Sequence, residues 1–310
     1  MNFDELGRSI QNLENISDLE NLLAQKTVGL KIPTAAKVYH GKVRNVLDRG
    51  DGILEIYHTD RLTAFDCMIT NVPFKGIILN GMAAWWFNQI DFMPHHFLSR
   101  LTDRSIACKK LTPFKIEIVV RGYLAGSMLR DYLIGRREIS GQKIPEGLNP
   151  FQKLPCTIIT PTTKAPVFEH DEDTTAVQLI HTGICNAQEW EIITSHALKL
   201  FDFGSRVLRA KGWILVDTKY EFGKDAEGNI YLIDEVHTPD SSRFWKSESY
   251  ANRLAHKLEP EMLDKENVRQ YLIRQGFKGR GSVPEIPFVE IKRLLTTYLE
   301  VFLSLSTPES

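Results

Sequence analysis

Residues 213–245 alternate apolar and polar stretches in an order that few local structures accommodate. Two apolar runs, 213–216 and 230–233, flank a polar turn, 223–229, which begins with a glycine and holds a second glycine near its end. Apolar runs around a glycine-containing turn are typical of a β-hairpin. This segment therefore predicts two antiparallel strands joined by a short loop.

The same hairpin carries charge where a plain hairpin has apolar or neutral residues. Asp217, Lys219 and Glu221 alternate along the first strand, and all three share one face because successive side chains of a strand point to opposite faces. The second strand ends in Asp234 and Glu235. Carboxylates from two neighbouring strands, with a lysine between them, are what a divalent cation and a polyphosphate need. We therefore expect the chemistry of this chain here.

The register of the hairpin decides whether its carboxylates meet. Glu221 and Asp234 share a face only if the residues paired across the strands have numbers of opposite parity, as when Glu221 pairs with Ile230. Pairing Phe222 with Ile230 places the two carboxylates on opposite faces. Both registers fit the sequence. A plainer interpretation of the charges also fits, in which they lie on the solvated face of an antiparallel sheet.

Length and composition set the broad class of protein. A chain of 310 residues with 43% hydrophobic and 25% charged residues is typical of a globular protein that divides into two lobes. Its formal net charge of −1 argues against electrostatic attraction to nucleic acid or to a membrane surface. The N-terminus lacks the apolar core of a signal peptide, and the four cysteines stand far apart without a CxxC pair, a pattern typical of reduced thiols and not of a zinc site or disulfide framework. We expect a cytoplasmic monomer or small homo-oligomer that binds neither nucleic acid nor membrane.

Periodicity predicts both helices and strands along the chain. Besides the hairpin, the expected strands cover 37–47, 53–59 and 114–120, and the expected helices cover 3–28, 82–92, 127–134, 176–209, 249–257, 265–275 and 288–303. Residues 141–175 contain five prolines and predict a loop-rich segment. A boundary near residues 111–118 would separate a strand-rich N-terminal lobe, 1–115, from a mixed C-terminal lobe, 116–310.

Two further segments favour anion binding. Gly41 lies beside Lys42 and Arg44, and amides freed by a glycine, with two cations on one strand face, bind phosphate oxygens. A solvated sheet edge is the plainer interpretation of that segment. Arg121 ends a buried strand shortly before Gly126–Ser127, where a helix N-terminus would add free amides. A strand-end arginine followed by a serine cap explains this second pattern equally well.

Seven blocks of sequence together resemble one enzyme family. They are GKVR at 41–44, TDRLTAFD at 59–66, KGIILN at 75–80, EIVVRGYLAGS at 117–127, TPTTKA at 160–165, DTKYEFG at 217–223 and DEVHTPDSSRFW at 234–245. In order and spacing, from about residue 38 to 300, they are similar to the longer form of phosphoribosylaminoimidazole-succinocarboxamide synthase, or SAICAR synthetase. Three positions depart from residues common in that family: Asn45, Leu47 and His237.

The resemblance implies an α+β fold with two lobes, related to ATP-grasp enzymes and distantly to kinases, with ATP in the cleft between the lobes. It also implies a reaction in which ATP, L-aspartate and carboxyaminoimidazole ribonucleotide give SAICAR, ADP and phosphate in de novo purine biosynthesis. Making an amide from a carboxylate requires a better leaving group than oxide, and phosphorylation supplies one. Mg²⁺ as cofactor would offset the charge of the phosphates.

The resemblance also implies roles for single residues. The Mg²⁺ ligands would be Glu221 and Asp234. The residues that contact ATP would be Gly41, Lys42, Arg44 and Lys219. The residues that hold the ribonucleotide would be Arg121, Ser127, Asp240, Ser241 and Arg243. The residues expected to take part in catalysis would be Lys219, Asp66 and Lys164. The last two would face the acceptor, with Lys164 a candidate for a substrate carboxylate.

Two other functions fit the same residues. A small-molecule kinase with the same lobes would release a stable phosphoester and ignore aspartate, so ADP release that depends on aspartate separates it from a ligase. A non-catalytic nucleotide sensor would tolerate loss of Asp234 or Lys219. Every charged position of the motif set is kept, which argues against the sensor.

Overall fold

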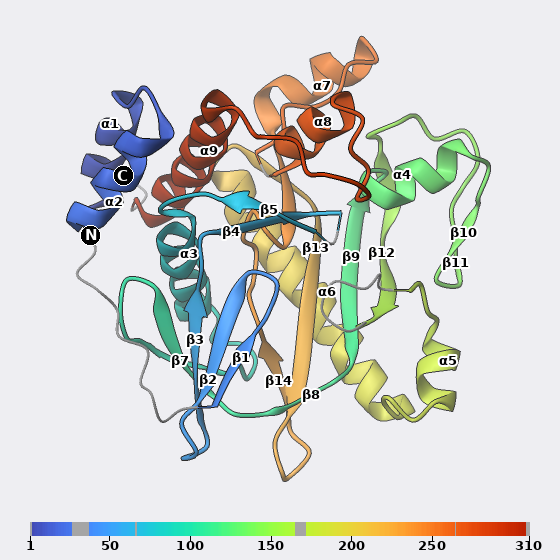
Figure 1. The fold of residues 1–310 in the computed structure, drawn as a ribbon. Helices are drawn as coiled ribbons and strands as arrows, with labels where there is room; N and C mark the ends of the chain where they lie inside the picture. Colours follow the sequence, from blue (N-terminus) through green and yellow to red (C-terminus); the bar gives the residue numbers. More distant parts are fainter. Residues whose placement is uncertain (1, 27–36, 66, 165–171, 264, 308–310) are drawn as a thin grey trace. The chain divides into compact units, whose positions relative to one another are not determined.

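The structure is a computed structural model, and it describes residues 2–26, 37–65, 67–164, 172–263 and 265–307. Packing contacts divide the chain into two compact units. The first unit comprises residues 1–89, 97–110 and 264–310, and the second comprises residues 90–96 and 111–263. Each contains helices and antiparallel sheet, which confirms the mixed α and β class expected from the sequence (Figure 1). Within these described ranges, no helix has the length and apolarity needed to cross a membrane.

An antiparallel sheet of five strands forms the framework of the first unit. Its order is β1 (Lys37–His40), β2 (Arg44–Asp48), β3 (Ile53–His58), β7 (Ser105–Lys109) and β6 (Phe97–Arg100). The helix α3 (Lys75–Gln89) packs on β3, β6 and β7, and it is buried almost all round. It starts before the expected residue, Met82. The sequence does not reveal its first turns because they contain Gly76 and Gly81, which lower helix propensity and are required by close packing. A Cβ on Gly76 would lie 2.4 Å from the carbonyl oxygen of His58.

The C-terminal helix belongs to the first unit. The helix α9 (Phe288–Ser306) packs against α3 and against α1 (Phe3–Gln11), where the rings of Phe3 and Phe302 meet edge to face with centroids 4.6 Å apart. This division by contacts differs from the expected lobes, 1–115 and 116–310, because periodicity within one helix does not reveal which distant helix covers it. The unit also contains α2 (Ile16–Lys26), β4 (Arg61–Ala64), β5 (Cys67–Asn71) and α8 (Glu266–Arg274).

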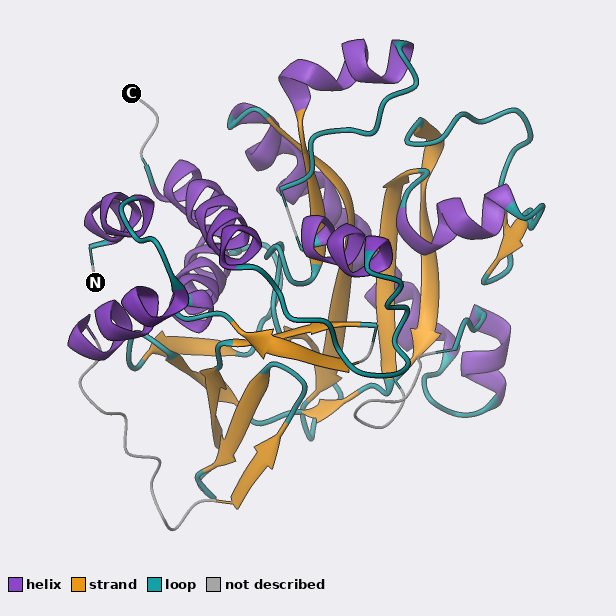
Figure 2. Cartoon of the chain, turned by 45° about the horizontal axis from the view of Figure 1, so that its top comes forward, coloured by secondary structure: helices purple, strands orange, loops and turns teal. Residues whose placement is uncertain are grey.

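The second unit is built on an antiparallel sheet that includes the expected hairpin. The strands run in the order β12 (Lys153–Thr163), β9 (Ile116–Tyr123), β13 (Trp213–Lys224) and β14 (Ile230–Ile233), and β15 (Ser242–Lys246) and β8 (Thr112–Pro113) also pair with β13. The long helix α6 (Ala187–Ala210) crosses one face of this sheet (Figures 1 and 2). Shorter elements are α4 (Gly126–Leu133), β10 (Glu138–Ile139), β11 (Gln142–Lys143), α5 (Ala176–His181) and α7 (Ser247–Ala255).

The packing of α6 decides which face of the second sheet stays polar. Tyr220 and Phe222 of β13 are fully buried, and Phe222 lies against His196 of α6, with ring centroids 6.4 Å apart. Because side chains alternate along a strand, Lys219 and Glu221 lie on the opposite face. The helix therefore covers the apolar residues of the hairpin, and the charged residues lie together on the opposite face of the sheet.

The strand β12 forms where the sequence predicts a loop. It stands at the end of the sheet order with β9 as its neighbour, and its pairing is irregular between Lys153 and Ile158, where Pro155 lies. Pro161 pairs with Ile118 of β9. An edge strand tolerates proline because the N–H that proline lacks faces away from the sheet. Pro155 and Pro161 therefore lie in an edge strand, whereas Pro145 and Pro150 lie in loops as the sequence predicts.

Candidate active site

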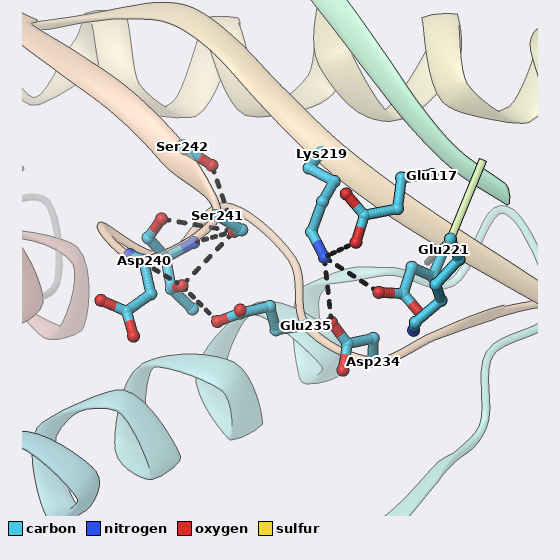
Figure 3. Close-up of polar contacts among 10 residues, drawn as sticks. Glu117, Lys219, Glu221, Asp234, Glu235, Asp240, Ser241 and Ser242 are labelled. Atoms are coloured by element: carbon cyan, nitrogen blue, oxygen red, sulfur yellow. Dashed lines mark hydrogen bonds and ion pairs between the residues drawn. The ribbon is translucent and has the colours of Figure 1, made fainter. Parts of the chain in front are cut away.

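Lys219 lies at the centre of a cluster of charged side chains in the second unit (Figure 3). Its ammonium donates to Glu117 Oε1 at 2.7 Å and to Glu221 Oε1 at 2.9 Å, and Asp234 Oδ2 lies 4.0 Å from it. Lys164 forms an ion pair with the other oxygen of Glu221. The Glu221 side chain is only 4% exposed, so its charge is stabilised mainly by the two lysines. We call these five residues the carboxylate–lysine cluster.

The carboxylates of the cluster keep Lys219 charged. Burial by itself lowers the pKa of a lysine, but attraction to Glu221, Glu117 and Asp234 outweighs burial and raises the pKa of Lys219 well above its ordinary value. An ammonium group held in this way is a ready donor to phosphate oxygens. It can exchange a carboxylate partner for a phosphate oxygen without losing its charge.

The observed hairpin register is neither of the two pairings considered above, but it has the parity that places Glu221 and Asp234 on opposite faces. Both carboxylates nevertheless lie beside Lys219. Glu221 pairs with Ile233 and Lys224 with Ile230, so regular alternation would turn Asp234 to the α6 side of the sheet. The strand β14 ends at Ile233, and Asp234 has φ +69°, in the left-handed region. This change of backbone direction returns the Asp234 carboxylate to Lys219 (Figure 3). Such a conformation is uncommon outside glycine, and its occurrence here favours a functional role.

The carboxylate–lysine cluster offers hard oxygen ligands without forming a complete protein cage for a metal. Across the part of the chain that the structure describes, no group of three or more His, Cys, Asp and Glu side chains is arranged to hold a metal ion. Mg²⁺ does not need one, because one or two carboxylates commonly bind it while phosphates and water complete its shell. Glu221 and Asp234, both beside Lys219, fit that pattern.

A second cluster joins two arginines through one carboxylate. Arg243 Nη1 donates to both oxygens of Asp217, at 2.8 and 3.0 Å, and Arg121 Nη1 lies 3.6 Å from Asp217 Oδ2. Arg121 also donates to Thr160 Oγ1 at 2.8 Å and to Ser127 Oγ at 3.4 Å. Burial lowers the pKa of Arg121, and the Asp217 carboxylate opposes that shift. Guanidinium groups are well suited to bind phosphate and carboxylate oxygens. We call these five residues the arginine cluster.

The start of α4 supports the arginine cluster. The helix begins at Gly126 as the sequence predicts, but the serine cap does not form, because the residue before the helix is Ala125 and it makes no side-chain cap. Ser127 accepts a hydrogen bond from Arg121 instead. Because Ser127 does not cap the helix, its hydroxyl lies beside Arg121. An anion bound by Arg121 would lie near the same hydroxyl.

The turn between β14 and β15 carries Asp240 and Ser241, the other two residues expected to hold the ribonucleotide. Its amides bond inward, because Ser241 N and Ser242 N donate to the Thr238 carbonyl at 3.1 and 2.9 Å. Lys219 N donates to the Ser241 carbonyl at 3.0 Å. These bonds hold the turn against the backbone of β13 beside the carboxylate–lysine cluster (Figure 3).

The two clusters lie on one face of the β9–β13 strand pair. Arg121 pairs with Asp217, and Val119 pairs with Lys219. Residues two apart in a strand point to the same face, so Glu117 joins Arg121 on that face of β9. Lys219 is two residues from Asp217, a separation of about 6.7 Å along the strand. The carboxylate–lysine cluster and the arginine cluster are therefore neighbours on one rigid surface.

The expected ATP-contacting residues of the N-terminal half lie in the first unit, at the turn between β1 and β2. The single strand predicted over 37–47, with Lys42 and Arg44 on one face, is wrong, because the chain reverses at residues 41–43. Gly41 N donates to the Arg44 carbonyl at 2.8 Å, and a Cβ on Gly41 would lie 3.0 Å from that oxygen. Glycine thus closes a tight hairpin between two short strands, which a periodicity signal does not resolve.

The structure thus brings most of the expected site residues into two groups. Glu221, Asp234, Lys219 and Lys164 form part of the carboxylate–lysine cluster, and Arg121, Ser127 and Arg243 form part of the arginine cluster. Asp66 lies outside the described residues. The roles assigned to all of these residues stay predictions.

Sequence reasoning misses Glu117 and assigns no ligand to Asp217, although each contacts residues that it does identify. Asp217 stands two residues before Lys219, and Glu117 stands four residues before Arg121. The signal that finds Glu117 is alternation along β9, once the arginine at 121 is placed on the polar face.

Carboxylates and lysines beside arginines on one surface are the groups that an enzyme of phosphorylated substrates requires. The profile of the SAICAR synthetase family matches residues 37–285. A Flavobacterium psychrophilum protein named phosphoribosylaminoimidazole-succinocarboxamide synthase is 39% identical over 280 residues, which is 89% of each chain. One of the same name from Legionella pneumophila is 41% identical over 273 residues, 86% of each chain. The chain belongs to the SAICAR synthetase family.

Solved structures agree with this assignment. A SAICAR synthase from Saccharomyces cerevisiae, solved in complex with SAICAR, superposes with a TM-score of 0.77 at 27% identity, covering 91% of this chain and 99% of that one. A type-2 SAICAR synthetase solved in complex with ADP superposes with a TM-score of 0.68 at 26% identity, covering 88% of this chain and all of that one.

Proposed function

We propose that this chain joins L-aspartate to the carboxylate of 5-amino-1-(5-phosphoribosyl)imidazole-4-carboxylate, giving SAICAR, ADP and phosphate in purine biosynthesis. Its family and the names of its relatives support the ligase activity. The family structure solved with ADP supports the use of ATP. The relation to ATP-grasp enzymes, the cytoplasmic location and the oligomeric state stay predictions.

The chemistry runs in two transfers. The γ-phosphoryl group of ATP passes to a carboxylate oxygen of the ribonucleotide, so the bond to the β-phosphate breaks and ADP leaves. The amine of aspartate then attacks the acyl carbon, the carbon–oxygen bond to phosphate breaks, and the nitrogen loses a proton as the amide forms. Neither transfer needs a covalent bond to the protein, so positioning and charge stabilisation supply the catalysis.

The carboxylate–lysine cluster is the proposed site of the phosphoryl transfer. Lys219, kept charged by its neighbours, would donate to ATP phosphate oxygens, and Lys164 would contact the carboxylate of the acceptor. Glu221 and Asp234 would hold Mg²⁺, which when bound neutralises charge on the phosphates. Both Glu221 oxygens accept from lysines in the structure, so the lysines would turn to the substrates as that carboxylate turns to the metal.

The arginine cluster is the proposed site of the ribonucleotide. The forked guanidinium groups of Arg121 and Arg243 match the oxygens of a phosphate, and Ser127 adds a hydroxyl donor. Asp217 contacts both arginines and holds them in place. Asp240 and Ser241, on the adjoining turn, would complete the contacts to this substrate.

One observation carries the proposal: the two clusters occupy the same face of β9 and β13, about two residues apart along the strands. A ligase of this type must hold a polyphosphate and a phosphorylated carboxylate acceptor at the same time. Neighbouring sites on one sheet face meet that requirement with fixed geometry.

The test is to measure ADP and SAICAR together while each substrate is omitted in turn. We expect ADP and SAICAR to appear in equal amounts when ATP, Mg²⁺, the ribonucleotide and L-aspartate are all present. Removing aspartate should suppress sustained ADP release. Undiminished ADP release without aspartate, with a phosphorylated ribonucleotide accumulating, would identify a kinase and contradict the proposal.

A further inference from the structure

Arg61, the first residue of β4, bonds to the turn between β1 and β2. Its Nη2 donates to the carbonyl of Gly41 and to Asn45 Oδ1, both at 2.9 Å, and its Nε donates to the carbonyl of Lys42 at 3.1 Å. A longer contact, 3.4 Å, reaches the carbonyl of Arg44. One guanidinium group therefore donates hydrogen bonds to three main-chain oxygens of a single turn.

The remaining carbonyl of the turn is held by the same segment. Val43 O accepts from Thr59 N at 3.2 Å and from Thr59 Oγ1 at 2.7 Å. The carbonyls of all four residues 41–44 thus accept hydrogen bonds from residues 59–61. A carbonyl oxygen repels an anion, whereas an amide N–H attracts one. Holding these oxygens against residues 59–61 keeps them from facing a phosphate on the other side of the turn.

The residue before Arg61 is anchored to the core of the first unit. Asp60 accepts two parallel hydrogen bonds from Arg104, each 2.8 Å long. Asp60 Oδ1 also accepts from Gly76 N, in the first turn of α3, at 2.9 Å. A two-bond contact between arginine and carboxylate fixes orientation as well as distance. Arg61 therefore extends from a rigid base.

The charge of Arg61 adds to that of the turn. All of its hydrogen bonds among the described residues go to uncharged oxygens, so no carboxylate neutralises its guanidinium group directly. Lys42 and Arg44 belong to the same turn. A positive group that is not neutralised by its partners raises the potential felt by an approaching polyphosphate.

We infer that Arg61 is a positioning residue for ATP, which sets the shape and charge of the turn at residues 41–44 without contacting the nucleotide. This inference rests on the proposed function, in which Lys42 and Arg44 contact ATP phosphates. Arginine is required because lysine has a single donor centre and cannot reach the oxygens of Gly41, Lys42 and Asn45 together.

The experiment compares Arg61→Gln and Arg61→Lys with Arg49→Gln, a matched control. Arg49 follows β2, at the opposite end of that strand from the turn, and pairs with Glu55. Lys42→Ala reports whether the turn contacts ATP. For each variant the melting temperature, the KM for ATP, the KM for the ribonucleotide and the hydrogen exchange of residues 38–47 are measured in the full-length enzyme.

We expect Arg61→Gln to raise the KM for ATP about tenfold or more and to speed exchange in the turn, while the KM for the ribonucleotide stays within about twofold. Arg61→Lys should recover only part of the loss, and Arg49→Gln should resemble the wild type. A folded Arg61→Gln or Arg61→Lys enzyme with an unchanged KM for ATP overturns the inference if Lys42→Ala raises that KM. If Lys42→Ala also leaves it unchanged, the turn does not contact ATP, and the proposed role of Lys42 falls together with the inference.

Discussion

Gly126 and Arg243 lie so close together that a Cβ on Gly126 would stand 2.6 Å from the guanidinium carbon of Arg243. The glycine has φ +58° at the first position of α4, a conformation that L residues seldom adopt. It therefore serves two purposes, since it permits the start of the helix and leaves the space in which Arg243 meets Asp217. No other residue type fulfils both.

This contact predicts that Gly126→Ala raises the KM for the ribonucleotide. The new methyl group would displace the flexible end of Arg243, and loss of one charge-assisted hydrogen bond corresponds to about a tenfold rise. Gly135→Ala is the matched control, because Gly135 follows the same helix with φ +92°, but no described residue lies within 4 Å of a Cβ at that position. Both variants carry the backbone strain, so an equal effect of the two on the KM would contradict the role of Arg243.

The Mg²⁺ assignment predicts that Asp234→Asn lowers kcat by about a hundredfold or more in a folded enzyme, because the metal loses a charged oxygen ligand. Steady-state kinetics at several Mg²⁺ concentrations measure the effect. Glu227→Gln, in the exposed loop of the same hairpin, should leave kcat unchanged. Glu221→Gln should resemble Asp234→Asn, and the double variant should lose less than the product of the two effects. Wild-type activity of folded Asp234→Asn at ordinary Mg²⁺ would refute the assignment.

The contact between Glu117 and Lys219 predicts an effect on ATP use that the sequence alone does not suggest. Glu117→Gln removes one of the charges that raise the pKa of Lys219 and weakens the 2.7 Å hydrogen bond that orients its ammonium group. We expect kcat/KM for ATP to fall about tenfold, the effect of losing a hydrogen bond between charged groups. Glu117→Asp keeps the charge and should lose less. Equal kcat/KM in Glu117→Gln and the wild type would show that Lys219 does not depend on Glu117.

The burial of His237 predicts how the free energy of unfolding depends on pH. Its side chain is fully buried and contacts the Tyr220 hydroxyl, and burial lowers the pKa of His237 from 6.5 to about 3. Between these values the unfolded chain binds a proton that the folded chain excludes, so folding stability falls as the pH is lowered through this window. His237→Phe should remove about 1.4 kcal/mol per pH unit of that dependence between about pH 6 and 4. Urea unfolding at several pH values measures it, and equal slopes for the two proteins would contradict a buried neutral histidine.

The hairpin at residues 213–245 could be predicted because its signals are local. The apolar runs, the glycines of the turn and the alternating charges all lie within one short segment, and the strands β13 and β14 form where they indicate. The side-chain position of Asp234 could not be predicted in the same way. It depends on the left-handed backbone conformation of Asp234 itself, at the end of a strand. A strand register assumes regular alternation and therefore does not predict that conformation.

Long-range packing limited the remaining predictions. Glu117 joins Lys219 only because β9 and β13 pair in one register, and α9 joins α1 through contacts such as Phe3 with Phe302. The strand β12 lies within the segment that the sequence predicts to be loop-rich, because the loop signal of proline does not include the position of a strand at the edge of its sheet. The resemblance of the motifs indicated the activity without these details, since motifs report which side chains are kept and not what they contact.

We propose that the carboxylate–lysine cluster holds Mg·ATP while the neighbouring arginine cluster holds the ribonucleotide. Calorimetric titration of Mg·ADP and of carboxyaminoimidazole ribonucleotide into wild type, Asp234→Asn and Arg243→Lys tests this division most directly. We predict that Asp234→Asn weakens Mg·ADP binding about tenfold or more and changes ribonucleotide binding by less than about threefold, and that Arg243→Lys does the reverse. If Arg243→Lys instead weakens Mg·ADP and leaves ribonucleotide affinity intact, the two substrates are assigned to the wrong clusters.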